Sequence, residues 1–369
     1  MDDLFLIFWK NKTPKHQFLS FVMKTELNLK KKLLIAVKSP LTKDNEMPIR
    51  HRVAIPFFLL ILFYISSSAQ INVHYKTETI TFQSGNFKII SELNFPKTDE
   101  NHPLVIMVHG DGPAYRTYFA KLKKAMLRAG YATLMWDKPG FGESTGNFSK
   151  ERRLAERASI VVDAVKFMKK HAAIDSNRIG VWGISQAGYV MPRAIKQTDN
   201  INFMIAVSCP GMNSIDQTAY LIRKQMIFEG LSEKEARQAE IYFKGLYTAK
   251  SFQEYIQHAQ PLYDNPTQRK LGFVSALWDE NNWKPHNPDE ESFFNPIEII
   301  ETLTIPVLAF FGEKDTQIDP FQGAEAYKKA LEKAGNQNFQ VELIPNADHN
   351  IILCKTGSMK ERNGRSRKE

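Results

Sequence analysis

Short apolar runs alternate with longer amphipathic stretches along most of this chain. The runs fall at 104–108, 131–136, 178–183, 203–208, 306–311 and 339–344, and helical patterns fall at 117–129, 150–172, 186–196 and 321–334. Strands that are apolar on both faces belong to sheets covered on both sides. Their alternation with helices is typical of a mostly parallel sheet. The sequence therefore predicts an α/β fold with a doubly covered sheet.

Two further segments complete the expected domain, 70–354. Strand-like runs at 73–82 and 87–95, joined by a turn at 84–86, precede the alternating part. The stretch 212–300 breaks the alternation with helical patterns, many charges and several aromatic residues. We interpret 212–300 as a helical cap inserted into the domain near the sheet edge, rather than as a separate domain.

Composition narrows the class of protein. The 369 residues are 43% hydrophobic and 11% aromatic, which is typical of a folded globular chain. The 2 cysteines are too few for a disulfide scaffold or a four-cysteine zinc module. We expect no cofactor and no metal.

The net charge of +9 lies at the two ends of the chain. Residues 1–69 carry a net charge of +6 and residues 355–369 carry +4, which leaves −1 for the long body between them. A nearly neutral body offers no basic groove, so we do not expect nucleic acid as a partner.

The N-terminal segment has the features of an export signal. Thirteen apolar residues at 53–65 follow Arg50 and Arg52, and the small residues Ser67 and Ala69 come after them. We expect translation to start at Met47, with 1–46 an upstream extension, 47–69 a signal peptide and the mature protein exported. The alternative is an uncleaved membrane anchor, which would be the chain's one link to a membrane.

Two serines compete as a nucleophile. Ser144 lies in a literal G-x-S-x-G, whereas Ser185 lies in Gly183-Ile184-Ser185-Gln186-Ala187. A nucleophile elbow requires a strand that enters a sharp turn and then a helix. Ser185 has this setting and Ser144 lies in a loop, so we predict Ser185. The glycines around Ser144 also imitate a dinucleotide motif, but no helix begins at the last of them.

Three further sites follow the ends of predicted strands. A glycine-rich turn after 104–108 places Asp111 where its backbone N–H could hold an oxyanion, together with the N–H of Gln186. Asp315 follows 306–311 and His349 follows 339–344. Sites in α/β sheets gather at these strand ends. We expect a Ser185–His349–Asp315 triad, with Asp319 and Asp348 as weaker candidates for the acid.

These motifs together resemble the α/β-hydrolase family, in its esterase and serine-aminopeptidase-like branch with a cap. The resemblance rests on 109–112, on Asp137 with the loop 140–144, on 183–188, and on Asp315 and His349. It implies a serine hydrolase in which Ser144 and Asp137 are structural.

Three functions stay open at this point. The first is an exported enzyme that cleaves carboxylic esters through an acyl-enzyme. The second is a peptidase of the same fold (aminopeptidase or prolyl-oligopeptidase-like), for which Glu233, Glu235 or Glu240 would hold a substrate amine. The third is an inactive binding protein or a truncated product. Residues 355–369 are basic and lack an apolar stripe, so we expect a disordered tail in place of a final helix, with truncation of the chain there as an alternative.

Overall fold

A computed structural model describes residues 74–147 and 154–366 of this chain. The predicted extension 1–46 and signal segment 47–69 lie outside these residues. Within the described ranges, no helix combines the length and the apolar character that a membrane span requires.

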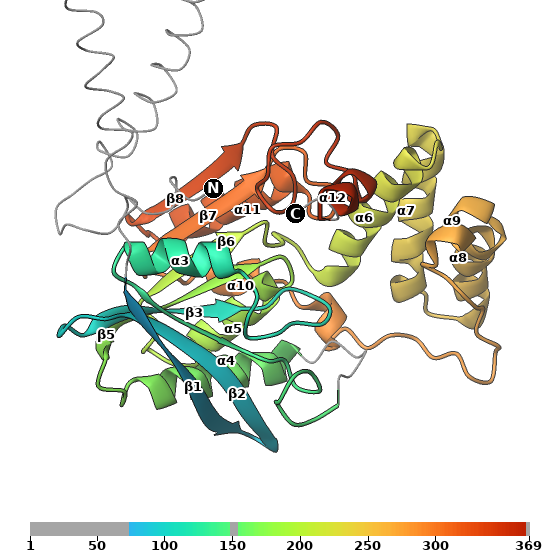
Figure 1. Cartoon of the computed structure of the whole chain (residues 1–369). Helices are drawn as coiled ribbons and strands as arrows, with labels where there is room; N and C mark the ends of the chain where they lie inside the picture. Colours follow the sequence, from blue (N-terminus) through green and yellow to red (C-terminus); the bar gives the residue numbers. More distant parts are fainter. Residues whose placement is uncertain (1–73, 148–153, 367–369) are drawn as a thin grey trace, which may run out of the picture.

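One eight-stranded sheet forms the centre of the molecule (Figure 1). Its order is β1-β2-β4-β3-β5-β6-β7-β8. β1 and β2 form an antiparallel hairpin, β2 also pairs antiparallel with β4, and the pairs from β4 through β8 are parallel. The bounds are Tyr75–Ser84, Phe87–Pro96, His102–Val108, Ala132–Trp136, Ile174–Ile184, Phe203–Val207, Val307–Gly312 and Phe339–Ile344 for β1 to β8. The doubly covered, mostly parallel sheet is confirmed, and β8 lies at its edge.

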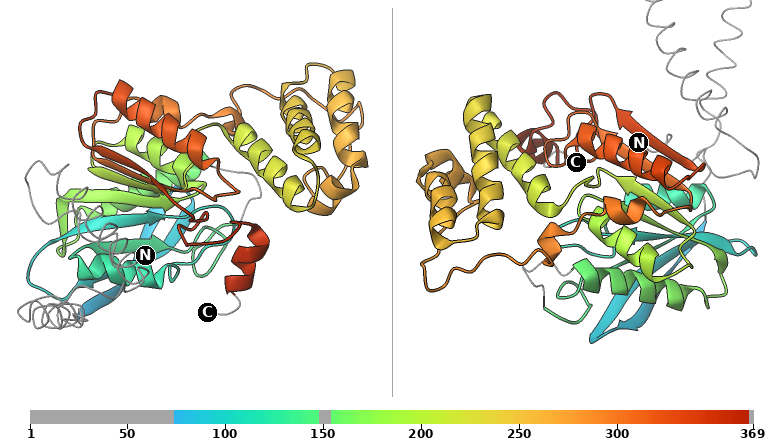
Figure 2. Two further views of the ribbon diagram at one scale, coloured as in Figure 1. Left: turned by 90° about the horizontal axis from the view of Figure 1, so that it is seen from above. Right: turned by 180° about the vertical axis from the view of Figure 1, so that it is seen from behind.

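Helices cover both faces of the sheet (Figure 2). The larger apolar cluster joins the strands to α4 (Leu154–Met168), α5 (Ala187–Gln197), α10 (Ile297–Ile300) and α11 (Pro320–Lys333). The smaller cluster, on the opposite face, includes Met126 of α3 (Ala120–Arg128). The order of strands reverses at β3, which lies between β4 and β5, and such a point is where α/β sheets bind ligands.

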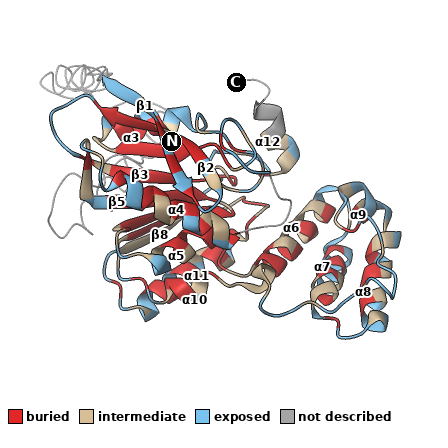
Figure 3. Ribbon diagram, turned by 90° about the horizontal axis from the view of Figure 1, so that it is seen from below, coloured by how far each residue is buried: buried red, intermediate tan, exposed pale blue. Residues whose placement is uncertain are grey.

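The insertion between β6 and β7 forms a small helical bundle beside the sheet, with α6 nearest to it (Figures 1 and 2). Its helices are α6 (Ser214–Phe228), α7 (Glu233–Thr248), α8 (Phe252–Asp264) and α9 (Pro266–Leu271), followed by the short helix η1 (Glu291–Phe293). Each of α6 to α9 begins at an Asn or Ser whose side chain accepts a backbone N–H of the first turn. Buried faces of these helices meet each other (Figure 3).

The C-terminal segment differs from the expected disordered tail, because α12 spans Met359–Ser366. Polar contacts hold this segment in place, and such contacts need no apolar stripe in the sequence. The Glu361 carboxylate accepts the backbone N–H groups of Lys355, Thr356 and Gly357. These donors lower the pKa of Glu361 to about 2. In addition, Thr316 donates its hydroxyl to the Gly357 carbonyl at 3.0 Å.

Candidate active site

Ser185 occupies a strained turn between β5 and α5. Its φ of 59° lies in the left-handed region, which serine rarely adopts. The Ser185 N–H donates to the Val207 carbonyl at 3.0 Å, and its carbonyl accepts the Gly188 N–H at 2.9 Å. The neighbouring strand and the first turn of α5 thus hold the strained backbone in place. Such strain on a half-buried serine at a strand–helix junction is typical of a nucleophile elbow.

The elbow is possible because glycines lie against it. A Cβ on Gly183 would lie 2.5 Å from the Ala187 Cβ, so a larger residue would displace the start of α5. A Cβ on Gly110 would lie 3.1 Å from the Ile184 carbonyl oxygen and 3.5 Å from the Ser185 Cβ. The loop after β3 therefore touches the elbow, as expected from the pairing of β3 with β5.

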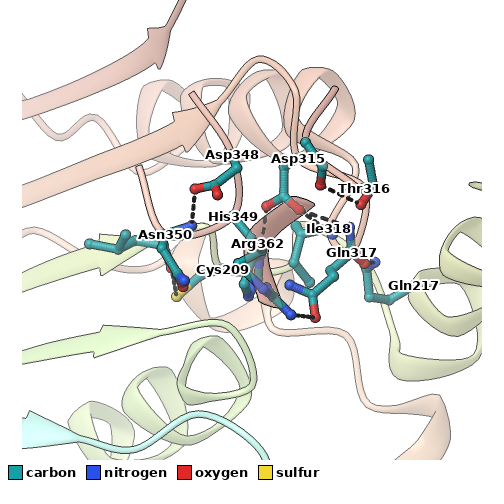
Figure 4. A network of polar contacts seen from close by, with 12 residues as sticks. Cys209, Gln217, Asp315, Thr316, Gln317, Ile318, Asp348, His349, Asn350 and Arg362 are labelled. Atoms are coloured by element: carbon teal, nitrogen blue, oxygen red, sulfur yellow. Dashed lines mark hydrogen bonds and ion pairs between the residues drawn. The ribbon is translucent and has the colours of Figure 1, made fainter. Parts of the chain in front are cut away.

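Asp315 and His349 form a buried hydrogen-bonded pair. His349 Nδ1 lies 2.7 Å from Asp315 Oδ2, and the two side chains are 8% and 1% exposed. The other carboxylate oxygen, Oδ1, accepts the N–H groups of Gln317 and Ile318 at 2.8 and 3.1 Å. Figure 4 shows the Asp315 carboxylate between the imidazole and these two backbone groups. The carboxylate is therefore fixed, and it orients the imidazole.

The three residues predicted as a triad all lie at the carboxyl edge of the sheet. Ser185 follows β5, Asp315 follows β7 and His349 follows β8, with β6 between the first two. The structure joins Asp315 to His349, and no hydrogen bond between Ser185 and His349 is present among the described residues. Hydrogen bonds to a nucleophile are often long in the absence of substrate.

The two predicted oxyanion donors lie on either side of this turn. Gln186 precedes α5 as its N-cap residue, and Asp111 follows Gly110 in the exposed loop after β3. Within the described part of the chain, neither backbone N–H has an acceptor. Two unpaired donors next to a strained serine can receive a negatively charged oxygen.

Ser144 has a different environment. Its hydroxyl is buried and accepts the Ile90 N–H at 2.9 Å, which fastens the loop after β4 to β2. Asp137 accepts the N–H groups of Arg116 and Glu143 at 2.8 and 3.0 Å and pairs with the Arg116 guanidinium. Both residues therefore hold loops together, and none of these bonds involves a residue of the elbow.

Comparison with known proteins agrees with this fold. The family described as serine aminopeptidase, S33, matches residues 99–271, a range that includes Ser185 and ends before Asp315. The fold is that of Pyrococcus horikoshii acylaminoacyl peptidase, at a TM-score of 0.51 and 17% identity over 83% of this chain and 41% of that longer one. A Pyrococcus furiosus esterase gives a TM-score of 0.50 and 18% identity, covering 79% and 88% of the two chains. This chain has the α/β-hydrolase fold.

Relatives of this chain by sequence are distant. An Escherichia coli protein described as "Uncharacterized 31.7 kDa protein in traX-finO intergenic region" is 24% identical over 249 residues, covering 63% of this chain and 79% of its own. The quorum-quenching protein AidA of Acinetobacter baumannii is 30% identical over 135 residues, 36% of this chain and 43% of its own.

The weaker acid candidates have structural positions in this chain. Asp319 is the N-cap of α11, where it accepts the N–H groups of Phe321 and Gln322. Asp348 accepts the N–H groups of Asn350 and Ile352, so its carboxylate closes the turn beside His349. Asp315 is the carboxylate that contacts the imidazole.

The acidic residues of the cap are already paired. Glu235 forms the capping box of α7 with Ser232. Glu233 lies 3.4 Å from Arg223 and 3.1 Å from Arg237, and Glu240 lies 3.3 Å from Arg223 and 3.2 Å from Lys244. None of the three carboxylates is therefore held ready for a substrate amine. Within the described ranges, no group of three or more potential ligands could hold a metal ion.

Two sets of residues near the site escaped the sequence analysis. Tyr220 and Gln217 of α6 donate to the backbone carbonyls of Asp315 and Gln317, so the cap contacts the loop that carries the acid. Lys138 and Arg157 contact the loop after β3 from behind. Lys138 adjoins Asp137 in a segment that the motifs had singled out, and this proximity could have drawn attention to it.

Proposed function

We propose that this protein is an exported serine hydrolase that cleaves carboxylic esters through an acyl-enzyme formed on Ser185. The hydrogen bond of 2.7 Å between His349 and Asp315 carries the proposal, since it sets up a general base at the same sheet edge as the strained serine. A buried aspartate that holds an imidazole in one orientation is the arrangement of a hydrolytic triad.

The mechanism follows from these roles. His349 accepts the Ser185 hydroxyl proton as the oxygen attacks the ester carbonyl, and Asp315 stabilises the resulting imidazolium. The N–H groups of Asp111 and Gln186 bind the oxyanion of the tetrahedral intermediate. His349 then gives the proton to the leaving alkoxide. Water, activated by the same imidazole, hydrolyses the acyl-enzyme and releases the carboxylic acid.

A peptidase of the same fold is the second candidate, and the match to the serine aminopeptidase family favours it. An aminopeptidase must bind the free amine of its substrate. The three acidic residues considered for this task pair with Ser232 and with Arg or Lys side chains of the cap. This pairing supports an ester over an aminoacyl substrate.

A substrate screen tests both candidates. Purified protein is assayed with p-nitrophenyl esters of two to twelve acyl carbons and with aminoacyl p-nitroanilides, beside its Ser185→Ala variant. We expect ester turnover that Ser185→Ala lowers by orders of magnitude. Turnover of the anilides alone would favour the peptidase. No turnover, together with no labelling of Ser185 by a fluorophosphonate, would contradict both.

Export is proposed from residues 47–69 alone. The charged flank, apolar run and small residues support cleavage after Ala69. N-terminal sequencing of protein from its native cell tests this step. A mature chain that retains residues before Met47 would contradict both the start site and the cleavage.

A further inference from the structure

Two cationic side chains hold the carbonyl groups of the loop after β3. Lys138 Nζ donates to the carbonyl oxygens of Gly110 and Gly112 at 2.8 and 2.7 Å. Arg157, on α4, donates through Nη2 to the same Gly110 oxygen at 3.1 Å and also to the His109 carbonyl. The Gly110 carbonyl therefore receives hydrogen bonds from two cations that come from different parts of the chain.

This arrangement fixes the direction of one peptide group. The peptide bonds of the described residues are trans, so the C=O and N–H of a given peptide point in opposite directions. The carbonyl of the Gly110–Asp111 peptide points at Lys138 and Arg157. The Asp111 N–H therefore points away from both cations. Gly110 itself lies against the elbow, because a Cβ added to this glycine would lie 3.5 Å from the Ser185 Cβ.

Arg157 also reaches the second donor. Its Nη1 donates to the side-chain oxygen of Gln186, whose backbone N–H lies directly after the serine. One guanidinium thus contacts both the loop that carries Asp111 and the residue that carries the other N–H. A single rigid, planar group therefore bridges the loop that carries Asp111 and the side chain of Gln186.

The two cations are placed here at an energetic cost. Lys138 is buried, and burial together with Arg157 lowers its pKa to about 7. Burial also lowers the pKa of Arg157 to about 10, and Asp111 opposes both shifts. His109, beside them, has a pKa well below 6.5 because it is buried, and it donates from Nε2 to the Trp136 carbonyl at 2.6 Å. A cavity of about 10 Å³ lies among these residues.

We propose that Lys138 and Arg157 are positioning residues of the oxyanion hole. Both side chains donate hydrogen bonds to carbonyls of residues 109–112. These bonds hold the Asp111 N–H toward the tetrahedral intermediate and align it with the Gln186 N–H. The charge of Arg157 also favours the oxyanion electrostatically. This inference rests on the proposed function, because it assumes acyl transfer at Ser185.

The test uses the full chain and the Lys138→Met variant, which keeps the length of the side chain and removes both hydrogen bonds. The readouts are kcat and KM for p-nitrophenyl butyrate, and the affinity for an alkyl trifluoromethyl ketone, which forms an oxyanion on the serine. We expect kcat to fall about ten- to hundredfold, below the 10²–10³ loss for a removed donor. KM should stay within about twofold, and the ketone affinity should fall in parallel with kcat.

Lys123→Met is the matched control. Lys123 is also a buried lysine that donates to a backbone carbonyl, that of Arg116, and it pairs with Glu92 at 2.8 Å, but neither of these contacts involves residues 109–112. Its loss should reduce the melting temperature and leave kcat within about twofold. Arg157→Lys is the second variant, should Lys138→Met fail to fold. A lysine there has one donor atom in place of the two Nη atoms that contact Gln186 and Gly110, so kcat should again fall with little change in KM.

The outcomes separate this inference from the proposed function. If the wild-type protein neither turns over esters nor labels at Ser185, the proposed function fails and this inference fails with it. If the wild type is active through Ser185 but Lys138→Met and Arg157→Lys retain its kcat, the positioning role alone is overturned. An equal loss of kcat in Lys123→Met, or a rise in KM with unchanged kcat, also overturns it.

Discussion

The Tyr220 hydroxyl donates a hydrogen bond of 2.9 Å to the backbone carbonyl of Asp315. This contact joins cap helix α6 to the loop that carries the proposed acid. Burial raises the pKa of Tyr220 well above 10, so the phenol remains a donor in alkaline solution. The cap therefore contacts the loop that carries the proposed acid, and we expect the position of Asp315 to depend on Tyr220.

Tyr220→Phe should weaken this link. The variant leaves the Asp315 carbonyl without its tyrosine donor, which should lower the free energy of unfolding by about 1–3 kcal/mol. We expect a several-fold loss of kcat, since the carboxylate and imidazole are held less firmly. Tyr242→Phe is the control, because Tyr242 of α7 makes a ring contact with His258 in the cap. Equal kcat values for the two variants would contradict the link.

The two serines should respond to alanine in opposite ways. Ser185→Ala should abolish fluorophosphonate labelling and leave the fold intact. Ser144→Ala should retain labelling but lower the free energy of unfolding by about 1–3 kcal/mol, because the buried Ile90 N–H loses its acceptor. Labelling followed by urea unfolding measures both effects. Loss of labelling in Ser144→Ala, with Ser185→Ala still labelled, would reverse the assignment.

Gly357 should be sensitive to any side chain. Its φ is 72°, and a Cβ would lie 1.8 Å from the Lys314 carbonyl oxygen, directly before Asp315. Gly357→Ala should therefore lower the melting temperature and reduce kcat by displacing the acid loop. Gly335→Ala is the control, since Gly335 has a φ of 66° and nothing within 4 Å of an added Cβ. A melting temperature lowered equally by both variants would show that backbone strain alone matters.

Lys138 should give the stability a particular pH dependence. Its pKa falls from 10.5 in the unfolded chain to about 7 in the fold. Between these values the unfolded state binds more protons, so this residue makes stability rise with pH, by at most about 1.4 kcal/mol per pH unit. Below about pH 7 the contribution is constant. Urea unfolding of the wild type and Lys138→Met from pH 6 to 9 should show a difference that grows above pH 7. A difference that is constant with pH would contradict a buried, easily deprotonated lysine.

The sequence predicted the parts of the site that follow strand ends. Ser185, Asp315 and His349 were found because parallel strands bring their carboxyl ends to one edge, and the apolar runs marked those strands. The choice of Asp315 over Asp348 also followed from position. The contact between Asp315 and His349 now supports that choice directly.

Other contacts left no pattern in the sequence. Arg157 lies 47 residues from Gly110 in the sequence. The sequence does not distinguish an arginine that binds a distant carbonyl from one that is exposed to solvent on an amphipathic helix. Tyr220 lies 95 residues from Asp315, so its contact depends on the path of the cap, which local periodicity does not encode. The order in 355–366 could not be predicted for a related reason. Glu361 binds backbone N–H groups, and a sequence pattern does not show which backbone groups a side chain binds.

The separate apolar cluster of the cap has a consequence for how this chain can diverge. The buried members of that cluster all come from residues 215–274, and they pack against one another. Substitutions within this cluster therefore act first on the cap, and they reach the loop that carries Asp315 through contacts such as those of Tyr220 and Gln217. Over generations, the cap can accumulate changes with less effect on the sheet than changes in the larger cluster would have.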